Sequence, residues 1–310
     1  MDRPGSTGVV QSADRHLSGT EERLRGYLEL LRPANVVTAV ADVLAGYAVA
    51  GRENHRALPW LLGATVCLYA GGVVLNDVFD RTLDAVERPE RPIPSGRVSA
   101  SRAAWLGGML LTAGVVLAAQ GSRAAAMVAA AVAAMVLLYD GRMKRYAIAG
   151  PISMGLCRGL NVILGMAAVP AALTSGWPIG LISVVYIAAV TLVSRGEVHG
   201  GKSGAATFAL ISLSGVIAVL ALLGGGANIV ERVAGLALIA LLAYRVLPAF
   251  WQARNEPSPA AIRRAVKAGV LSLVLVDASI SVSYAGPVYG AIVLATALVA
   301  GSLARLFSVT

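Results

Sequence analysis

Residues 60–97 decide the fold: the apolar run WLLGATVCLYAGGVVL (60–75) leads directly into NDVFDRTLDAVERPERPIPSGR (76–97). The first part is long and apolar enough to cross most of a bilayer. The acidic side chains that follow would therefore lie at or just inside one membrane interface. Because a charged residue in a membrane helix costs about 2.5 to 3.5 kcal/mol on insertion scales, such residues indicate a function.

The acidic residues of this motif have helical spacing. If the helix continues through the motif, Asn76, Asp80 and Asp84 recur every four residues and Asp77 precedes Asp80 by three, so all four can share one face. Carboxylates placed this close repel one another unless a cation lies between them. Mg²⁺ is the natural partner, because it prefers oxygen ligands and joins one or two carboxylates to the phosphates of a substrate.

Arginines follow the carboxylates. Arg88, Arg91 and Arg97 offer the planar, forked donors that suit phosphate oxygens, and RPERPIPSGR forms a stiff turn around them. The alternative is a solvated cytoplasmic loop whose arginines only set the membrane topology. The helical register of the carboxylates favours a phosphate site over that alternative.

The pattern Asn76-Asp77-x-x-Asp80-x-x-x-Asp84, followed by RPIPSGR (91–97), resembles the first signature of the UbiA-type intramembrane prenyltransferases. LRPAN (31–35) at the start of the first membrane helix and YDGRMKR (139–145) at the end of the fourth agree with this resemblance. It implies a bundle of about nine transmembrane helices around a central cavity, with two acidic motifs at the cytoplasmic face that bind Mg²⁺ and a prenyl diphosphate. The metal ligands that it implies are Asn76, Asp77, Asp80, Asp84 and Glu197.

The composition independently indicates a membrane protein. Hydrophobic residues make up 57% of the 310-residue chain and charged residues only 14%. We expect an all-α polytopic membrane protein, a bundle of nine to ten transmembrane helices around a central cavity. Ten spans are one more than is usual for the family, so either the last span is extra or 263–304 is a single span divided in error. The expected spans are 34–50, 58–79, 102–120, 123–140, 147–169, 177–194, 204–224, 229–250, 263–283 and 286–304.

The chain is expected to divide into three parts. Residues 1–20 are polar and predict a disordered cytoplasmic tail with no signal peptide. Residues 21–33 begin EERLRGYLELLR, where charge and leucine alternate at helical spacing; this predicts an amphipathic helix at the membrane interface, and a simple lead-in to the first span is the alternative. Residues 34–310 are expected to form a single UbiA-like transmembrane domain.

Positive charges set the expected orientation. Lysine and arginine gather in the N-terminal segment, in the loops after every second span and in the tail, whereas the opposite loops hold only Arg52, Arg56, Arg123 and Arg232. This positive-inside pattern places the acidic motif at the cytoplasmic face of the membrane, which we expect to be a bacterial plasma membrane. The net charge of +9 then reflects topology and attraction to anionic lipid, and it does not indicate a nucleic-acid partner.

Polar residues also occur inside the first span. Asn35, Thr38 and Asp42 form a stripe that should face the interior of the bundle. By the family resemblance, Asn35 lines the diphosphate end of the cavity. Asp42 lies deeper, where it either touches the acceptor or pairs with a neighbouring helix.

Arg158 and Asn161 lie two to three turns into the fifth span, within GLCRGLN (155–161), a string that resembles the EboC-like branch of the superfamily. This is too deep for the arginine to reach the interface with its long side chain. A buried arginine needs an anion, and an ion pair that joins two helices is the structural alternative to a substrate site. The candidate anions are Asp140, Asp42, Glu197 and the substrate diphosphate.

The second acidic motif departs from the family pattern. After the sixth span the chain reads TLVSRGEVHGGK (191–202), where only Glu197 remains as a carboxylate. Arg195 and Lys202 are therefore expected to bind the diphosphate directly, in place of metal charge. The same stretch fits the GxxxxGK[ST] pattern of a nucleotide-binding loop, but membrane spans flank it instead of the strand and helix that such a loop requires.

Two further groups of polar residues remain. By the resemblance, Tyr139 and Lys144 at the end of the fourth span approach the diphosphate and the acceptor, whereas the positive-inside rule alone explains the neighbouring arginines. Asp277 and Arg245 belong to no motif, and we expect each of them to pair between helices.

The resemblance predicts Mg²⁺-dependent transfer of a prenyl group from a prenyl diphosphate to a small cyclic or aromatic acceptor, through an allylic cation held in an apolar cavity. The alternatives are a terpene cyclase that needs no acceptor and a non-catalytic binder of isoprenoid diphosphate. The candidate bases for the acceptor's proton are Glu197, Asp140 and His199. The predicted catalytic residues are Asp77, Asp80, Asp84, Lys144 and Glu197. The predicted substrate-binding residues are Asn35, Asn76, Arg88, Arg91, Tyr139, Arg158, Asn161, Arg195 and Lys202.

Overall fold

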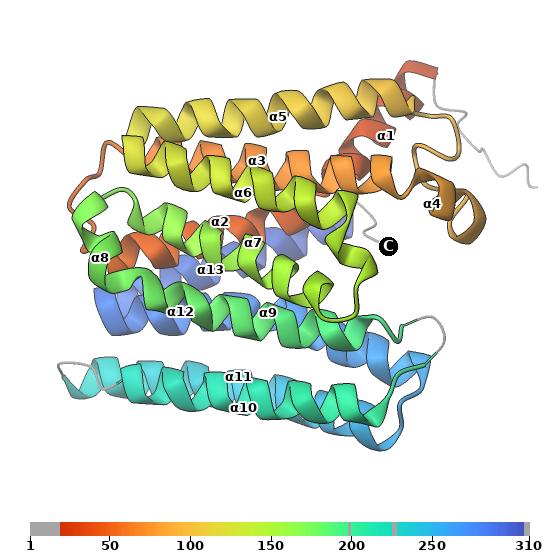
Figure 1. Cartoon of the computed structure of the whole chain (residues 1–310). Helices are drawn as coiled ribbons and strands as arrows, with labels where there is room; N and C mark the ends of the chain where they lie inside the picture. The colour runs from red at the N-terminus through yellow and green to blue at the C-terminus, as the bar shows by residue number, and fades with distance from the viewer. Residues whose placement is uncertain (1–18, 198–199, 225–227, 307–310) are drawn as a thin grey trace, which may run out of the picture.

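A computed structural model describes residues 19–197, 200–224 and 228–306, and every regular element within these ranges is a helix. The long helices run side by side across the molecule, so that their ends gather at two opposite faces (Figure 1). They are α2 (Pro33–Val49), α3 (Leu58–Phe79), α5 (Ala100–Gly121), α6 (Arg123–Gly141), α7 (Ala149–Met166), α9 (Gly180–Ser194), α10 (Ser203–Leu223), α11 (Ile229–Asn255), α12 (Pro259–Ala285) and α13 (Pro287–Leu306). The short helices are α1 (Gly19–Leu31), α4 (Arg81–Glu87) and α8 (Leu173–Gly176), with 3₁₀ turns η1 (Met143–Arg145), η2 (Pro170–Ala172) and η3 (Trp177–Ile179).

Seven helical segments of the described chain are long and apolar enough to cross a membrane. They are α3, α5, α6, the segment Pro170–Ser194 that ends in α9, and α10, α11 and α12. The other three predicted spans correspond to α2, α7 and α13. The prediction of an all-α membrane bundle is therefore confirmed, and the protein is a multi-pass integral membrane protein.

The last two long helices are separate elements. The chain turns at Gly286, where φ is +82°, a backbone conformation that glycine adopts at little cost. Pro287 then begins α13, a position at which proline loses no helical hydrogen bond. The segment 263–304 is thus two helices; α12 is one of the seven segments long and apolar enough to span, whereas α13 is a shorter apolar helix, so a second span there stays a prediction.

The outer helices face lipid with apolar side chains. Trp105 on α5, Leu222 on α10 and Tyr244 on α11 are 73%, 83% and 78% exposed, as expected where hydrocarbon tails replace water. By contrast, 72% of the apolar window of α12 is buried inside the protein. The protein interior therefore lies around α12 and the helices that pack on it.

Glycines bring three of these inner helices into close contact. A Cβ atom added to Gly46 on α2 would meet the carbonyl oxygen of Val162 on α7, and one added to Gly165 on α7 would meet the carbonyl oxygen of Val43. Gly155 makes the same kind of approach from α7 to the Val184 carbonyl on α9. Small residues at such positions allow backbones in a membrane bundle to pack directly against each other.

We expect Gly46→Ala to lower the free energy of unfolding by about 1–3 kcal/mol, because its new methyl group has to push the α7 backbone away. Thermal unfolding of the detergent-solubilised protein measures this. Gly108→Ala is the matched control: no atom lies within 4 Å of its added Cβ, so helix propensity should make the change neutral or slightly stabilising. Equal melting temperatures for the two variants would contradict the proposed contact.

The amphipathic segment predicted over 21–33 is a helix, α1, which ends at Leu31. Leu30 is fully buried against Val74 and Val98, so α1 packs on the end of α3 and on the segment that leads into α5. The chain then bends at Arg32, whose φ of 45° separates α1 from α2. Its position at a membrane interface stays a prediction, and the tail predicted for residues 1–20 lies almost entirely outside the described residues.

Candidate active site

A cavity of about 370 Å³ lies inside the bundle, between α2, α3, α6, α7, α9 and α12. This volume is within the range of small-molecule sites. Most of its wall is apolar, and the polar side chains gather at two places, one near the end of α3 and one deeper. Five predicted substrate-binding residues line it, namely Asn35, Asn76, Tyr139, Arg158 and Asn161.

The acidic motif lies where α3 passes into α4. Asp80 is the one residue between α3 and α4. Its N–H nevertheless donates to the Asn76 carbonyl at 2.9 Å, and its carbonyl accepts from the Asp84 N–H at 2.8 Å. The helical register therefore continues through the motif, as the spacing predicted. On such a helix the four side chains fall within an arc of about 100°, as predicted, with Asp77 and Asp84 toward one edge of this face and Asn76 and Asp80 toward the other.

One side of the motif consists of Asp77 and Asp84, which are seven residues apart and both buried. Arg91 joins them, with its Nη1 2.8 Å from Asp84 Oδ2 and 3.4 Å from Asp77 Oδ1. Arg32 approaches Asp77 Oδ1 at 2.6 Å from the bend before α2. Two arginines thus neutralise this pair of carboxylates.

The other side of the motif consists of Asn76 and Asp80. Asn76 Nδ2 donates to Asp140 Oδ1 at 2.6 Å, and Lys144 Nζ lies 2.7 Å from Asp80 Oδ1 and 3.8 Å from Asp140 Oδ1. Asp140 and Lys144 belong to the end of α6 and the turn η1. The structure therefore brings the first motif together with the segment 139–145, as the resemblance implied.

The carboxylates of the motif fit Mg²⁺ only together with a substrate. Among the described residues, no three His, Cys, Asp or Glu side chains are grouped so that they could hold a metal ion. The donors of the motif are nevertheless all oxygen atoms, and Mg²⁺ commonly binds one or two carboxylates and takes its other ligands from phosphates and water. The set Asn76, Asp77, Asp80 and Asp84 therefore suits Mg²⁺ that binds with a diphosphate.

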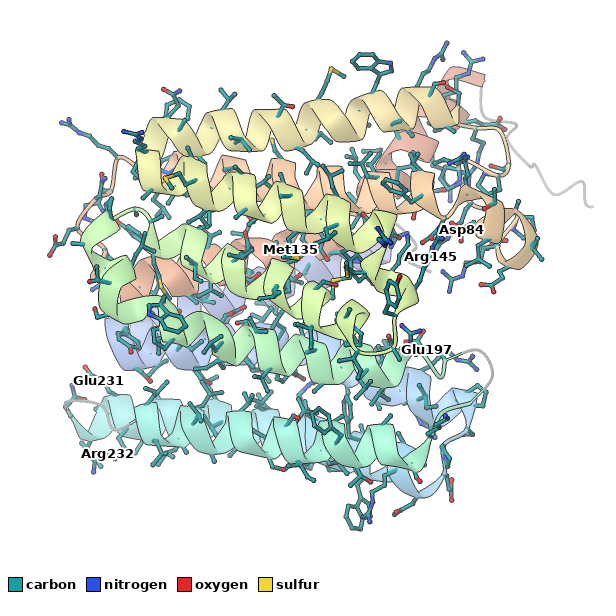
Figure 2. The ribbon with its side chains drawn as sticks, in the orientation of Figure 1. Asp84, Met135, Arg145, Glu197, Glu231 and Arg232 are labelled. Carbon is teal, nitrogen blue, oxygen red and sulfur yellow. The ribbon has the colours of Figure 1, made fainter. Side chains whose placement is uncertain are left out.

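The second motif lies at the same end of the bundle as the first. Asp84, Arg145 and Glu197 lie at one end of the molecule and Glu231 and Arg232 at the other (Figure 2). Burial raises the pKa of Glu197, although the nearby charges of Arg88 and Arg263 lower it. Glu197 does not line the cavity, and its role as a metal ligand stays a prediction.

The stretch 191–202 contains two residues predicted to bind phosphate, Arg195 and Lys202, and one candidate general base, His199. Arg195 donates to the backbone carbonyls of Lys144, Arg145 and Tyr146 at 3.1–3.4 Å, and so holds the turn that carries Lys144. Lys202 lies where α10 begins. His199 lies outside the described residues, and the flanks of its loop are α9 and α10, so the strand that a nucleotide-binding loop needs is absent from the described flanks.

Arg97, which the sequence grouped with the phosphate-binding arginines, contacts other residues. Its Nη1 lies 2.8 Å from Glu29 Oε2 on α1, and its Nη2 donates to the Glu90 carbonyl at 2.7 Å. Arg97 thus joins the RPERPIPSGR turn to α1, outside the cavity. Arg32, and not Arg97, lies beside the carboxylates of the motif. The only sign of this in the sequence was that Arg32 comes just before Pro33, at the start of the first span.

The deep polar group answers two questions that the sequence left open. Of the four candidate anions for Arg158, Asp42 is the one in contact, with Oδ2 3.1 Å from Arg158 Nε. Asp42 therefore pairs with a neighbouring helix and does not line the cavity. Arg245 on α11 pairs between helices, with its Nε donating to Ser272 Oγ on α12 at 3.3 Å, whereas neither oxygen of Asp277 has a hydrogen-bond partner among the described residues, so its pairing stays a prediction.

These features define a class of protein: a helical membrane protein with an apolar cavity in its bundle and a network of paired carboxylates and cations that reaches the cavity at its mouth, where Arg32, Asn76 and Asp140 line the wall. Residues 39–268 match the UbiA prenyltransferase family, and the chain belongs to that family. The family resemblance seen in the sequence is confirmed. Membership of the EboC-like branch stays a prediction.

Several curated relatives have the same name. The chain is 34% identical over 151 residues to the digeranylgeranylglyceryl phosphate synthase of Methanothrix thermoacetophila, a match that covers 48% of this chain and 57% of the relative. It is 36% identical over 146 residues to the protein of that name from Methanopyrus kandleri, covering 46% and 53%. The chain thus spans only a little over half the length of these relatives.

Solved structures share the fold. A structure described as digeranylgeranylglyceryl phosphate synthase in membranes has a TM-score of 0.63 and 23% identity, covering 85% of this chain and 99% of that one. An apo UbiA homologue from Aeropyrum pernix K1 has a TM-score of 0.61 and 17% identity, covering 79% and 96%. A UbiA homologue from Archaeoglobus fulgidus bound to GPP and Mg²⁺ has a TM-score of 0.59 and 15% identity, covering 83% and 99%. At these identities the likeness shows the fold alone.

Proposed function

We propose that this protein transfers a prenyl group from a prenyl diphosphate to a small acceptor, with Mg²⁺ as its cofactor. The observation that carries the proposal is the set of paired carboxylates and cations at the mouth of an apolar cavity in a UbiA-family bundle. The names of the curated relatives support it, as do two solved structures of a UbiA homologue from Archaeoglobus fulgidus, one bound to GPP and Mg²⁺ and the other to DMAPP and Mg²⁺.

The cations at the mouth are the donors that a diphosphate needs. Arg32, Arg91 and Lys144 are each paired with a carboxylate of the motif. When a diphosphate binds, its oxygens compete for these cations, and the carboxylates of Asp77, Asp80 and Asp84 become available to hold Mg²⁺. Mg²⁺, when bound, adds positive charge that makes the diphosphate a better leaving group. The remaining donors that we assign to diphosphate binding at this end are Asn35, Asn76, Arg88, Tyr139, Arg195 and Lys202.

The proposed reaction breaks the bond between the allylic carbon and the diphosphate oxygen, which keeps the electron pair. A nucleophilic atom of the acceptor supplies a new pair to that carbon, and its proton passes to a base. Asp140 is the best-placed base, because it lines the cavity and is only 3% exposed, whereas Glu197 lies outside the cavity wall. The apolar walls keep water away from the allylic cation.

The acceptor has two candidate classes. The sequence predicts a small cyclic or aromatic molecule, and the names of the relatives point to a glyceryl phosphate.

The positive-inside pattern supports an active site that faces the cytoplasm, and we propose the plasma membrane of a bacterium as its location. Neither the acceptor class nor the membrane location follows from family membership alone, so both are proposals.

The test is incubation of the purified protein with geranyl, farnesyl and geranylgeranyl diphosphate, with and without a cell extract as acceptor source, while diphosphate release is followed. We expect release that requires Mg²⁺, stops on addition of EDTA and depends on the extract. Release without extract would overturn transfer in favour of a cyclase or a hydrolase. Binding of the donors without release under any condition would favour a non-catalytic binder.

A further inference from the structure

A buried group of charged and polar side chains, the deep cluster, lies further into the membrane than the acidic motif. It consists of Asp42 on α2, Arg158 and Asn161 on α7, and Asp277 on α12, which are between 0% and 7% exposed. The centre of the Tyr69 ring lies 5.6 Å from Arg158 Cζ, so the position of Tyr69 on α3 shows how deep the cluster lies. Tyr69 precedes Asp77 by eight residues on α3, which corresponds to about 12 Å along the helix.

The two carboxyl groups of the deep cluster carry one negative charge between them. Asp277 is fully buried, and neither of its oxygens meets a hydrogen-bond donor from a described residue. An ionised carboxylate without a donor is so costly in an apolar interior that the group keeps its proton. The pair therefore balances the single charge of Arg158, and the cluster is neutral, which limits the cost of burying it.

Asn161 holds this arrangement in place and has no side-chain N–H donor left for a ligand. Its Nδ2 donates to the Ala39 carbonyl at 2.8 Å and to Asp42 Oδ2 at 3.0 Å. Its Oδ1 accepts from Thr65 Oγ1 at 2.7 Å. Asn161 is thus a positioning residue that orients Asp42, and Asp42 in turn orients the guanidinium.

Arg158 still has donors to offer. Its Nε faces Asp42, and its Nη2 makes only long contacts to the carbonyl and Oγ1 of Thr38, at 3.3 and 3.5 Å. No described residue accepts a hydrogen bond from Nη1, although Arg158 is only 7% exposed and lines the cavity. A guanidinium has five N–H donors, so the two on Nη1 are available to a molecule in the cavity.

We propose that Arg158 binds an oxygen atom of the acceptor, so that the acceptor is a compact molecule with a carboxylate, carbonyl or ring hydroxyl at its deep end. The inference rests on the proposed prenyl transfer and names the acceptor class. A hydrocarbon tail at this depth would leave buried charged donors unpaired, at a cost. An acceptor whose only polar group is a phosphate would keep that group beside the cations at the mouth.

The test compares three probes of the same ring size: 1-naphthoate, 1-naphthol and naphthalene. Binding to the detergent-solubilised full chain is measured by the rise in its melting temperature. We expect the two oxygen-bearing probes to stabilise the wild type at concentrations about tenfold lower than naphthalene, the difference that a hydrogen bond to a charged group supplies. Binding of geranyl diphosphate with Mg²⁺ is measured on the same samples.

The decisive variant is the charge-matched double change Asp42→Asn with Arg158→Gln, which removes one charge of each sign. We expect it to remain folded and to bind geranyl diphosphate as before, while its preference for the oxygen-bearing probes falls about tenfold. Arg158→Lys, which keeps the charge but lacks Nη1, should lose the same preference. Arg245→Gln is the control, because it removes another membrane arginine that does not line the cavity.

A folded double variant with the wild-type preference, or a wild type without any preference, would overturn the proposal. These outcomes are independent of turnover. If the wild type discriminates among the probes but never releases diphosphate in the presence of extract, the binding site for oxygen stands and the proposed prenyl transfer fails.

Discussion

Asp80→Asn is expected to lower Mg²⁺-dependent diphosphate release by about 10²- to 10³-fold, the loss that follows removal of one preorganised electrostatic group. Asp80 lies at the junction of α3 and α4, with Oδ1 2.7 Å from Lys144 Nζ. The substitution keeps the size of the side chain and removes its charge where Mg²⁺ and the diphosphate are proposed to meet. Single-turnover rates at saturating geranylgeranyl diphosphate measure the loss.

Lys144→Met separates two roles that Asp80 could have. If Asp80 binds Mg²⁺, a higher Mg²⁺ concentration should restore part of the activity of Asp80→Asn and none of that of Lys144→Met. If Asp80 only holds Lys144, both variants and their combination should lose the same activity at every Mg²⁺ concentration. Glu29→Gln is the matched control, because Glu29 pairs with Arg25 and Arg97 at this end of the bundle but does not line the cavity. Wild-type rates for Asp80→Asn would contradict the proposed site.

Arg158→Gln alone is expected to lower the free energy of unfolding by about 3–5 kcal/mol, the usual cost when one partner of a buried ion pair is removed. The change leaves Asp42 and Asp277 with their one negative charge and no arginine. The charge-matched double variant should recover most of this loss, since the remaining cluster is neutral. Unfolding in mixed detergent micelles with increasing sodium dodecyl sulfate measures each variant.

Asp42→Asn alone completes a double-mutant cycle with the wild type, Arg158→Gln and the double variant. We expect it to cost less than Arg158→Gln, because Asp277 can give up its proton and pair with the arginine in place of Asp42. The two single changes should therefore be strongly non-additive. Costs that simply add would show that the ion pair is not what stabilises the deep cluster.

The fold followed from the sequence because a membrane leaves a polypeptide few options. Every N–H and carbonyl in the hydrocarbon region has to be satisfied internally, so each long apolar run becomes a helix. All ten predicted spans correspond to helices in the structure, including the pair on either side of Gly286. The first motif was also readable, because its carboxylates are close in the sequence and their order is distinctive.

The partners of these residues were not readable, because they depend on contacts between distant segments. Four anions were equally plausible for Arg158, and only the packing of α2 on α7 selects Asp42, 116 residues earlier in the chain. Arg32 was not named as a site residue, since 45 residues separate it from Asp77. Helical spacing also did not show which cation contacts which carboxylate. Arg32 and Arg91 contact Asp77 and Asp84 on one side of the motif, whereas Lys144 contacts Asp80 on the other.

The glycine contacts among α2, α7 and α9 have a consequence for substrate selectivity. Backbones that touch cannot slide past one another without a clash, so these helices form a stiff wall along one side of the cavity. If the proposed isoprenoid donor lies in this cavity, room for a longer chain has to come from the wall that α3 and α6 form, where Leu68, Val132 and Val136 line the cavity. We therefore expect the size of a few aliphatic side chains, and not helix movement, to limit the length of the proposed donor.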